Sequence, residues 1–257
     1  MVWKRIAALL PLLLLPLTAL AQEAPQPAQA APPPHLFGGV EPMANDQLQV
    51  VDLLHAGKWK EAKSLAHRQL LAAAGYVDQY PGVVAAALAM DALADAGLGD
   101  EKPALCRWGA AQGIDPKLAG ADLSSFGAPG ALLQSHSVKA SPPEQGKRPE
   151  DLPEGHMDKG ETMAGGVRAP EYISRLPPEY PPAAHKAKQE GKVVIQSVVE
   201  KDGSVSRVHV REHQPLGLDV SALYAVCGWR FKPATLNGEP VPVYLMLTVN
   251  FKIEKTP

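Results

Sequence analysis

A run of residues near the C-terminus carries the pattern that most constrains this fold. Apolar side chains occupy every second position, at Val243, Leu245, Leu247, Val249, Phe251 and Ile253. Because successive side chains of a strand point to opposite faces, this run predicts a long strand with one buried face. Such a strand needs other strands to pair with and a further layer of structure to cover its apolar face.

The residues before this run predict its neighbours. Residues 193–199 and 205–210 are rich in valine and have the composition of two strands. Between them lies Asp202-Gly203, a dipeptide suited to a tight hairpin turn that needs positive φ. The two segments therefore predict an antiparallel hairpin.

Two helices are expected on either side of this hairpin. The first opens at Tyr180-Pro181 and stops near Gly191, and the second runs from Leu218 to Trp229. The resulting order is helix, strand, strand, helix, strand. It predicts an α+β fold in which two helices cover one face of a three-stranded antiparallel sheet.

An all-α region is expected upstream, over residues 44–126. Its residues 83–96 are alanine-rich and apolar nearly all round, so this helix should be buried. Two helical hairpins with this spacing resemble tetratricopeptide repeats. The resemblance is carried by Gly57-Lys58-Trp59-Lys60-Glu61-Ala62 and by Gly99 with Ala104, Trp108, Ala111 and Pro116. A small four-helix domain without a binding groove remains the alternative, because two repeats are few for a stable stack.

The N-terminus has the three parts of a secretory signal peptide, over residues 1–21. Lys4 and Arg5 precede an apolar run of about 15 residues, which is short for a membrane-spanning helix. Cleavage after Ala21 would place the mature chain in the periplasm. The alternative is an uncleaved anchor in the inner membrane, with the chain facing the periplasm.

The remaining boundaries follow from composition. Residues 22–43 are a proline- and alanine-rich tether, and residues 127–170 are a polar linker expected to be flexible. A structureless stretch of that length is unusual inside one compact domain, so it predicts a boundary. The C-terminal domain is then residues 171–257.

This C-terminal segment resembles the C-terminal domain of the TonB family of Gram-negative envelopes. The resemblance rests on an ordered set of short motifs rather than on any single one. These are Tyr180-Pro181, Ala184, Glu190-Gly191, Asp202-Gly203, Trp229-Arg230-Phe231, Pro233 and Phe251-Lys252-Ile253. Each also has a structural explanation, since the glycines suit turns and the aromatic residues suit a core.

The resemblance implies a partner-binding module and not an enzyme. In that family the domain binds an extended peptide of an outer-membrane transporter, which adds to the sheet as a strand. Residues expected to touch such a partner are Pro178, Tyr180, Met246, Thr248, Asn250 and Lys252. Pro177 departs from the family pattern, and the apolar run at residues 6–20 lacks the Ser and His that a proton-driven transducer uses.

Other chemistry finds little support in the sequence. The net charge of −2 does not suggest nucleic acid, and no phosphate loop, catalytic cluster, metal site or cofactor motif is present. His209 and His213 fall on or just past a strand, where their spacing does not suit a metal pair. Cys106 and Cys227 are expected in different domains as two free, packed thiols, although export would permit a bridge.

Two functions therefore remain. The first is a periplasmic TonB-family protein that binds an outer-membrane transporter or another envelope protein through an extended peptide, in energy-dependent transport. The second is a periplasmic scaffold or assembly factor that binds partners through its helical and TonB-like modules without energy coupling. Pairing of two copies through their own edge strands, as a homodimer, also stays open.

Overall fold

The structure is a computed structural model that describes residues 40–137, 154–156 and 166–253, with side chains in the first helix described from residue 47. The expected signal peptide and most of the tether lie outside these residues. Within the described ranges, no helix combines the length and apolarity needed to cross a bilayer.

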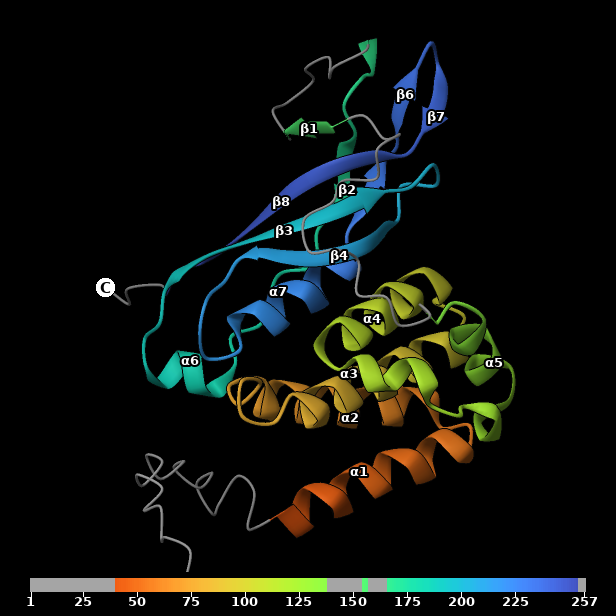
Figure 1. The fold of residues 1–257 in the computed structure, drawn as a ribbon, viewed down its shortest axis with the longest axis vertical. Coiled ribbons are helices and arrows are strands. Elements are labelled where there is room, and N and C mark those ends of the chain that lie inside the picture. The colour runs from red at the N-terminus through yellow and green to blue at the C-terminus, as the bar shows by residue number, and fades with distance from the viewer. Residues whose placement is uncertain (1–39, 138–153, 157–165, 254–257) are drawn as a thin grey trace, which may run out of the picture.

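The N-terminal part is a bundle of helices, called here the helical module (Figure 1). Gly57 separates the first two helices at φ 67°, and Pro81 opens the third, as its fixed φ favours. Helix α3 packs between α2 and α4 and is buried along most of its length, as its composition predicts. The helices are α1 Val40–His55, α2 Trp59–Ala74, α3 Pro81–Gly97, α4 Glu101–Ile114 and α5 Gly127–Ser135, with short 3-10 turns η1 Pro116–Gly120 and η2 Ser124–Phe126.

Helix α5 corrects one expected boundary. Residues 127–135 were assigned to the linker, but they form a helix whose Leu133 is completely buried in the helical core. At the other end of that linker, Val167 and Ala169 are buried in the C-terminal core. The expected linker of residues 127–170 is therefore wrong at both ends. A short apolar run among Gly, Pro and Ser carries too weak a periodicity to be distinguished from a loop.

The C-terminal part is built on a four-stranded sheet of order β1-β8-β3-β4 (Figure 1). Strands β3, β4 and β8 are the three strands expected from the sequence, and their pairing is antiparallel. Gly203 makes the hairpin turn at φ 78°, where an added Cβ would collide with the backbone of Phe231. The elements are β1 Glu154–His156, β2 Glu171–Ser174, α6 Pro182–Lys186, β3 Gly191–Val199, β4 Val205–Glu212, α7 Leu218–Cys227, β5 Arg230–Lys232, β6 Ala234–Leu236, β7 Glu239–Val241 and β8 Val243–Phe251.

The fold class is α+β, as expected, but three details differ. The sheet has a fourth strand, β1, which pairs in parallel with β8 and so makes the sheet mixed. Helix α6 is a single short turn of five residues instead of a helix reaching Gly191. Residues 230–232 form β5, which pairs with β2, so the chain is extended directly after Trp229.

Helix α7 joins the two parts of the molecule, because it lies between the sheet and the helical module (Figure 1). Leu218, Leu223 and Val226 belong to the core under the sheet, whereas Val220 belongs to the helical core. Eight of its ten residues are buried. A helix that is apolar all round is expected to be covered on every side, and α7 is covered by both parts.

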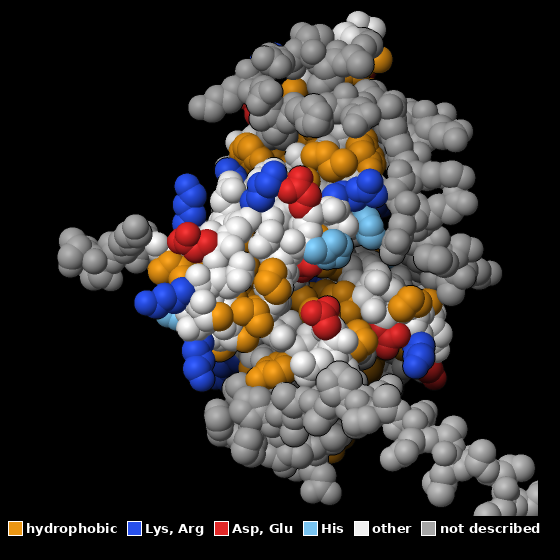
Figure 2. Space-filling model, turned by 60° about the vertical axis from the view of Figure 1, so that its left-hand side comes forward, with side chains coloured by type: hydrophobic (Ala, Val, Ile, Leu, Met, Phe, Trp, Pro, Cys, Tyr) orange, Lys and Arg blue, Asp and Glu red, His pale blue; other side chains and the backbone are white. Residues whose placement is uncertain are grey.

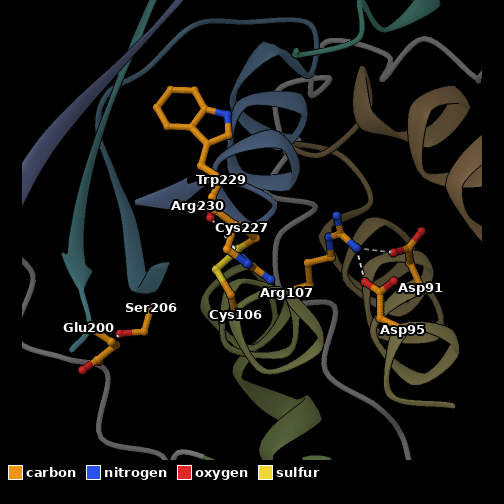
Figure 3. The surroundings of a disulfide bond; sticks show 9 residues. All are labelled: Asp91, Asp95, Cys106, Arg107, Glu200, Ser206, Cys227, Trp229 and Arg230. Atoms are coloured by element: carbon orange, nitrogen blue, oxygen red, sulfur yellow. Dashed lines mark hydrogen bonds and ion pairs between the residues drawn. A yellow bond between two sulfur atoms is a disulfide. The ribbon is translucent and has the colours of Figure 1, made fainter. Parts of the chain in front are cut away.

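A disulfide ties the same two parts together, which corrects the expectation of two free thiols. Cys106 on α4 and Cys227 at the end of α7 are bonded, with Cα atoms 5.5 Å apart and 121 residues between them in sequence (Figure 3). The ion pair of Lys102 with Asp202, 3.0 Å long, adds a contact from α4 to the hairpin turn. The helical and sheet parts therefore form one packed body and not two domains on a flexible tether.

Candidate functional site: the edge of strand β8

The two edges of strand β8 have different neighbours. On one side β3 pairs with it along its whole length, from Gly191 opposite Phe251 to Val199 opposite Val243. On the other side β1 pairs with residues 244–246 only. Residues 247–251, called here the open edge, have no strand beside them on this side within the described parts of the chain. The N–H and C=O groups that point outward from such an edge are free to bind an added strand.

The opposite end of the sheet is covered. Strand β4 is last in the sheet order, and α4 of the helical module lies against it (Figure 1). Val208 of β4 packs onto the helical core. Among the described residues, the open edge of β8 is therefore the part of this sheet best placed to receive another strand.

The alternation predicted for β8 is confirmed by its burial. Leu247, Val249 and Phe251 are buried in the core under the sheet, whereas Thr248 and Asn250 are exposed. The exposed side chains lie on the face of the sheet away from α7. An added strand would place alternate side chains beside them, which is how strand addition acquires selectivity.

The six residues predicted to touch a partner come from two segments. Met246 is half-buried and opposite His156 of β1, and Lys252 is exposed just beyond the end of β8. Tyr180 reaches the same end of the strand, because its ring lies edge-on against Phe251 with centroids 5.4 Å apart. Pro178 is half-buried two residues earlier. Their role in binding remains a prediction.

The segment that carries Tyr180 is fixed at several points. The indole Nε1 of Trp229 donates to the carbonyl of Leu176 at 2.9 Å, and the hydroxyl of Ser221 donates to the carbonyl of Glu179. The carboxylate of Glu179 lies 2.9 Å from Nε2 of His67 on α2. Both α7 and the helical module therefore hold this segment beside the end of β8.

A cluster of buried charges lies where the helical module meets α7. Arg107 on α4 pairs with Asp91, at 3.2 Å, and with Asp95, both on α3 (Figure 3). Lys63 also pairs with Asp95, and the ring of Tyr224 on α7 lies 3.8 Å below the Arg107 guanidinium. Two acids and two bases balance in charge, as buried ion pairs require.

Burial dominates the electrostatics of this cluster. It raises the pKa of Asp91 to about 6, although Arg107 acts in the opposite direction. Burial likewise raises the pKa of Tyr224, with the neighbouring Asp91 adding to the effect. The sequence carries a signal for this cluster, because Asp91 and Asp95 are the only charged residues of the apolar helix α3 and lie one turn apart.

A cluster of metal ligands or a broad patch of one charge would mark another kind of site. No group of three or more His, Cys, Asp or Glu side chains that could hold a metal occurs within the described residues. Figure 2 shows basic and acidic side chains interspersed among apolar ones over the face it presents, without a broad patch of one sign. Binding of a nucleic acid usually needs such a patch.

Comparison with known proteins places the C-terminal residues in a family. Residues 177–253 match the family model described as the Gram-negative bacterial TonB protein C-terminal. A protein TonB of Xanthomonas campestris pv. campestris is 35% identical over 78 residues, which cover 30% of this chain and 35% of that protein. A protein TonB of Vibrio cholerae is 31% identical over 90 residues, covering 34% and 37%.

A solved structure of a TonB C-terminal domain also matches part of this chain. The solution structure of the Pseudomonas aeruginosa TonB C-terminal domain is 27% identical, with a TM-score of 0.32, and the match covers 40% of this chain and 97% of that one. The chain spans about a third of the length of the curated relatives it matches. Residues 177–253 of this chain therefore belong to the TonB C-terminal family.

Proposed function

We propose that this chain is a periplasmic, non-enzymatic TonB-family protein that binds an outer-membrane transporter or another envelope protein by accepting an extended peptide at the open edge of β8. The observation that carries the proposal is the unpaired stretch of residues 247–251 within the region matched to the family. The role is transport across the outer membrane, coupled to energy if the N-terminus stays in the inner membrane.

The chemistry of recognition follows from the edge. Main-chain N–H and C=O groups bind any extended peptide, so they supply affinity without sequence preference. Thr248 and Asn250 would contact alternate side chains of the peptide, and Tyr180 would flank its end. Each hydrogen bond contributes about 1 kcal/mol net. Ordering the peptide offsets part of the contribution of the five positions, so the interaction is reversible.

A second candidate is a scaffold without energy coupling. It is favoured by the disulfide between Cys106 and Cys227, which joins the helical module rigidly to the TonB-like sheet. The helical module, whose identity as a tetratricopeptide array is still a prediction, would then hold one partner and β8 another. Identifying the N-terminal residue by mass spectrometry of envelope fractions separates the two. A start at Gln22 supports the scaffold, and an intact Met1 in the inner membrane supports energy transduction.

Photo-crosslinking tests the docking edge. A crosslinking residue at Asn250 should capture an outer-membrane protein from solubilised envelopes, whereas the same residue at Lys117, exposed on η1, should not. Thr248→Pro should abolish the capture, and Thr248→Ala, which keeps the main-chain N–H, should leave most of it. Thermal unfolding of both variants would show that the sheet survives. Unchanged capture by a folded Thr248→Pro variant would refute strand addition at this edge.

A further inference from the structure

We propose that residues 154–156 are a built-in occupant of the β8 edge, which a partner strand has to displace in order to pair with residues 244–246. The inference rests on the proposed function, because it concerns access to the same edge. It assigns a role to a segment of this chain that lies upstream of the region shared with the TonB family.

The pairing itself is the first observation. Strand β1 lies parallel to β8, with Glu154 opposite Tyr244, Gly155 opposite Leu245 and His156 opposite Met246. It lies on the side of β8 away from β3, and so on the side that carries the open edge (Figure 1). An incoming peptide that covered all nine residues of β8 would need the space that β1 fills.

The composition of β1 is the second observation. Glu-Gly-His has low strand propensity, since glycine and glutamate are depleted in strands. The segment is therefore extended because the edge of β8 offers it partners, and not because of its own preference. Three positions give few hydrogen bonds of about 1 kcal/mol each, so the contact is weak enough to be displaced.

The third observation is that β1 is held close to its site. The element before β1 in the described chain is α5, which packs on the helical core. The strand after it is β2, which pairs with β5. Because the disulfide and α7 join these two parts into one body, both anchors of the segment are fixed relative to β8. A tethered segment acts at an effective concentration in the millimolar range, which compensates for weak pairing.

A consequence for the partner follows. A peptide that extends over about five residues can occupy residues 247–251 without disturbing β1, whereas a longer extended peptide must compete with it. A partner strand of up to about five residues therefore binds without competition. A longer one loses the free energy needed to displace β1. A partner that displaces β1 gains the three further positions.

Amide hydrogen exchange in the full chain tests the occupancy without any partner. Along β8, successive backbone N–H groups alternate between facing β3 and facing outward. The exchange rates of all three amides of residues 244–246 are therefore measured. Gly155→Pro, and separately the pair Glu154→Pro with His156→Pro, should raise exchange of the outward-facing amides about tenfold. Gly160→Pro, the same substitution outside β1, should leave exchange unchanged. Equal exchange in wild type and both β1 variants would overturn the proposal.

A synthetic peptide with the sequence of residues 150–160 tests the competition. Added to the Gly155→Pro protein, it should shift the amide resonances of residues 244–246, and the wild type should need about ten times more peptide for the same shift. Equal titration curves would overturn the proposal. The proposed function is refuted by a different result, which is unchanged capture of a partner by the folded Thr248→Pro variant. The failure of one proposal can therefore be distinguished from the failure of the other.

Discussion

Removal of the disulfide tests whether the helical module and the sheet form one cooperative unit. The perturbation is Cys106→Ala together with Cys227→Ala, in which small apolar side chains replace two buried cysteines. The bond spans 121 residues of sequence. Closing a loop of that length removes unfolded-state entropy worth about 5 kcal/mol at 25 °C in the chain-entropy model, and measured values are often 2–4 kcal/mol. We expect the free energy of unfolding to fall by about 2–5 kcal/mol.

Urea unfolding followed by tryptophan fluorescence measures this loss. Trp108 is buried in the helical core and Trp229 in the core under the sheet, so each part has its own reporter. Trp3 is replaced by Phe throughout, so that a background with Trp59→Phe and Trp108→Phe reports on the sheet through Trp229, and a background with Trp229→Phe reports on the helical module. Reduction of the wild-type protein provides the control, because it opens the same loop without changing side-chain volume beyond the sulfur atoms.

The result also shows how the two parts depend on each other. Because α7 contributes to both cores, we expect the two tryptophans to report one coincident transition even without the disulfide. A loss below about 1 kcal/mol would refute the entropic reasoning. Two separated transitions would refute the conclusion that the modules form one body.

Further predictions concern the contact between the modules. Gly217 has φ 82°, and an added Cβ would lie 2.5 Å from the backbone of Ala74, so Gly217→Ala should lower the free energy of unfolding by about 2–4 kcal/mol. Gly99 has a similar φ of 85° but open space around it, so the control Gly99→Ala should lower it by only about 1 kcal/mol. Equal losses in urea titrations would contradict the close approach of Gly217 to Ala74. Because burial raises the pKa of Asp91 from 3.8 to about 6, its ionisation disfavours the folded state as the pH rises through this window. Between pH 4 and 7 the wild type should therefore lose up to about 3 kcal/mol of stability relative to Asp91→Asn, and parallel pH profiles would exclude the effect.

The elements that the sequence predicted are those with a local signature. Alternation over residues 243–253, the Asp202-Gly203 turn and the apolar α3 each depend on neighbours in sequence, and each is present. The family resemblance then predicted a docking edge among them, which periodicity alone could not have done.

The features that the sequence did not predict depend on contacts between distant residues. Cys106 and Cys227 have no spacing motif, and their pairing follows only from the way α4 packs beside α7. Strand β1 has no strand propensity, so its conformation comes from the edge it meets. The ion pairs around Arg107 could be predicted only once α3 and α4 were known to be neighbours.

The coverage of β4 by α4 limits how many molecules this sheet can join. A sheet with two free edges can link copies into an unlimited chain, as in fibrils, because each addition leaves another edge exposed. Here one end of the sheet is closed by the helical module and the other is partly filled by β1. Within the described residues this sheet therefore offers one edge for strand addition, and we expect assemblies built through it to end at a pair.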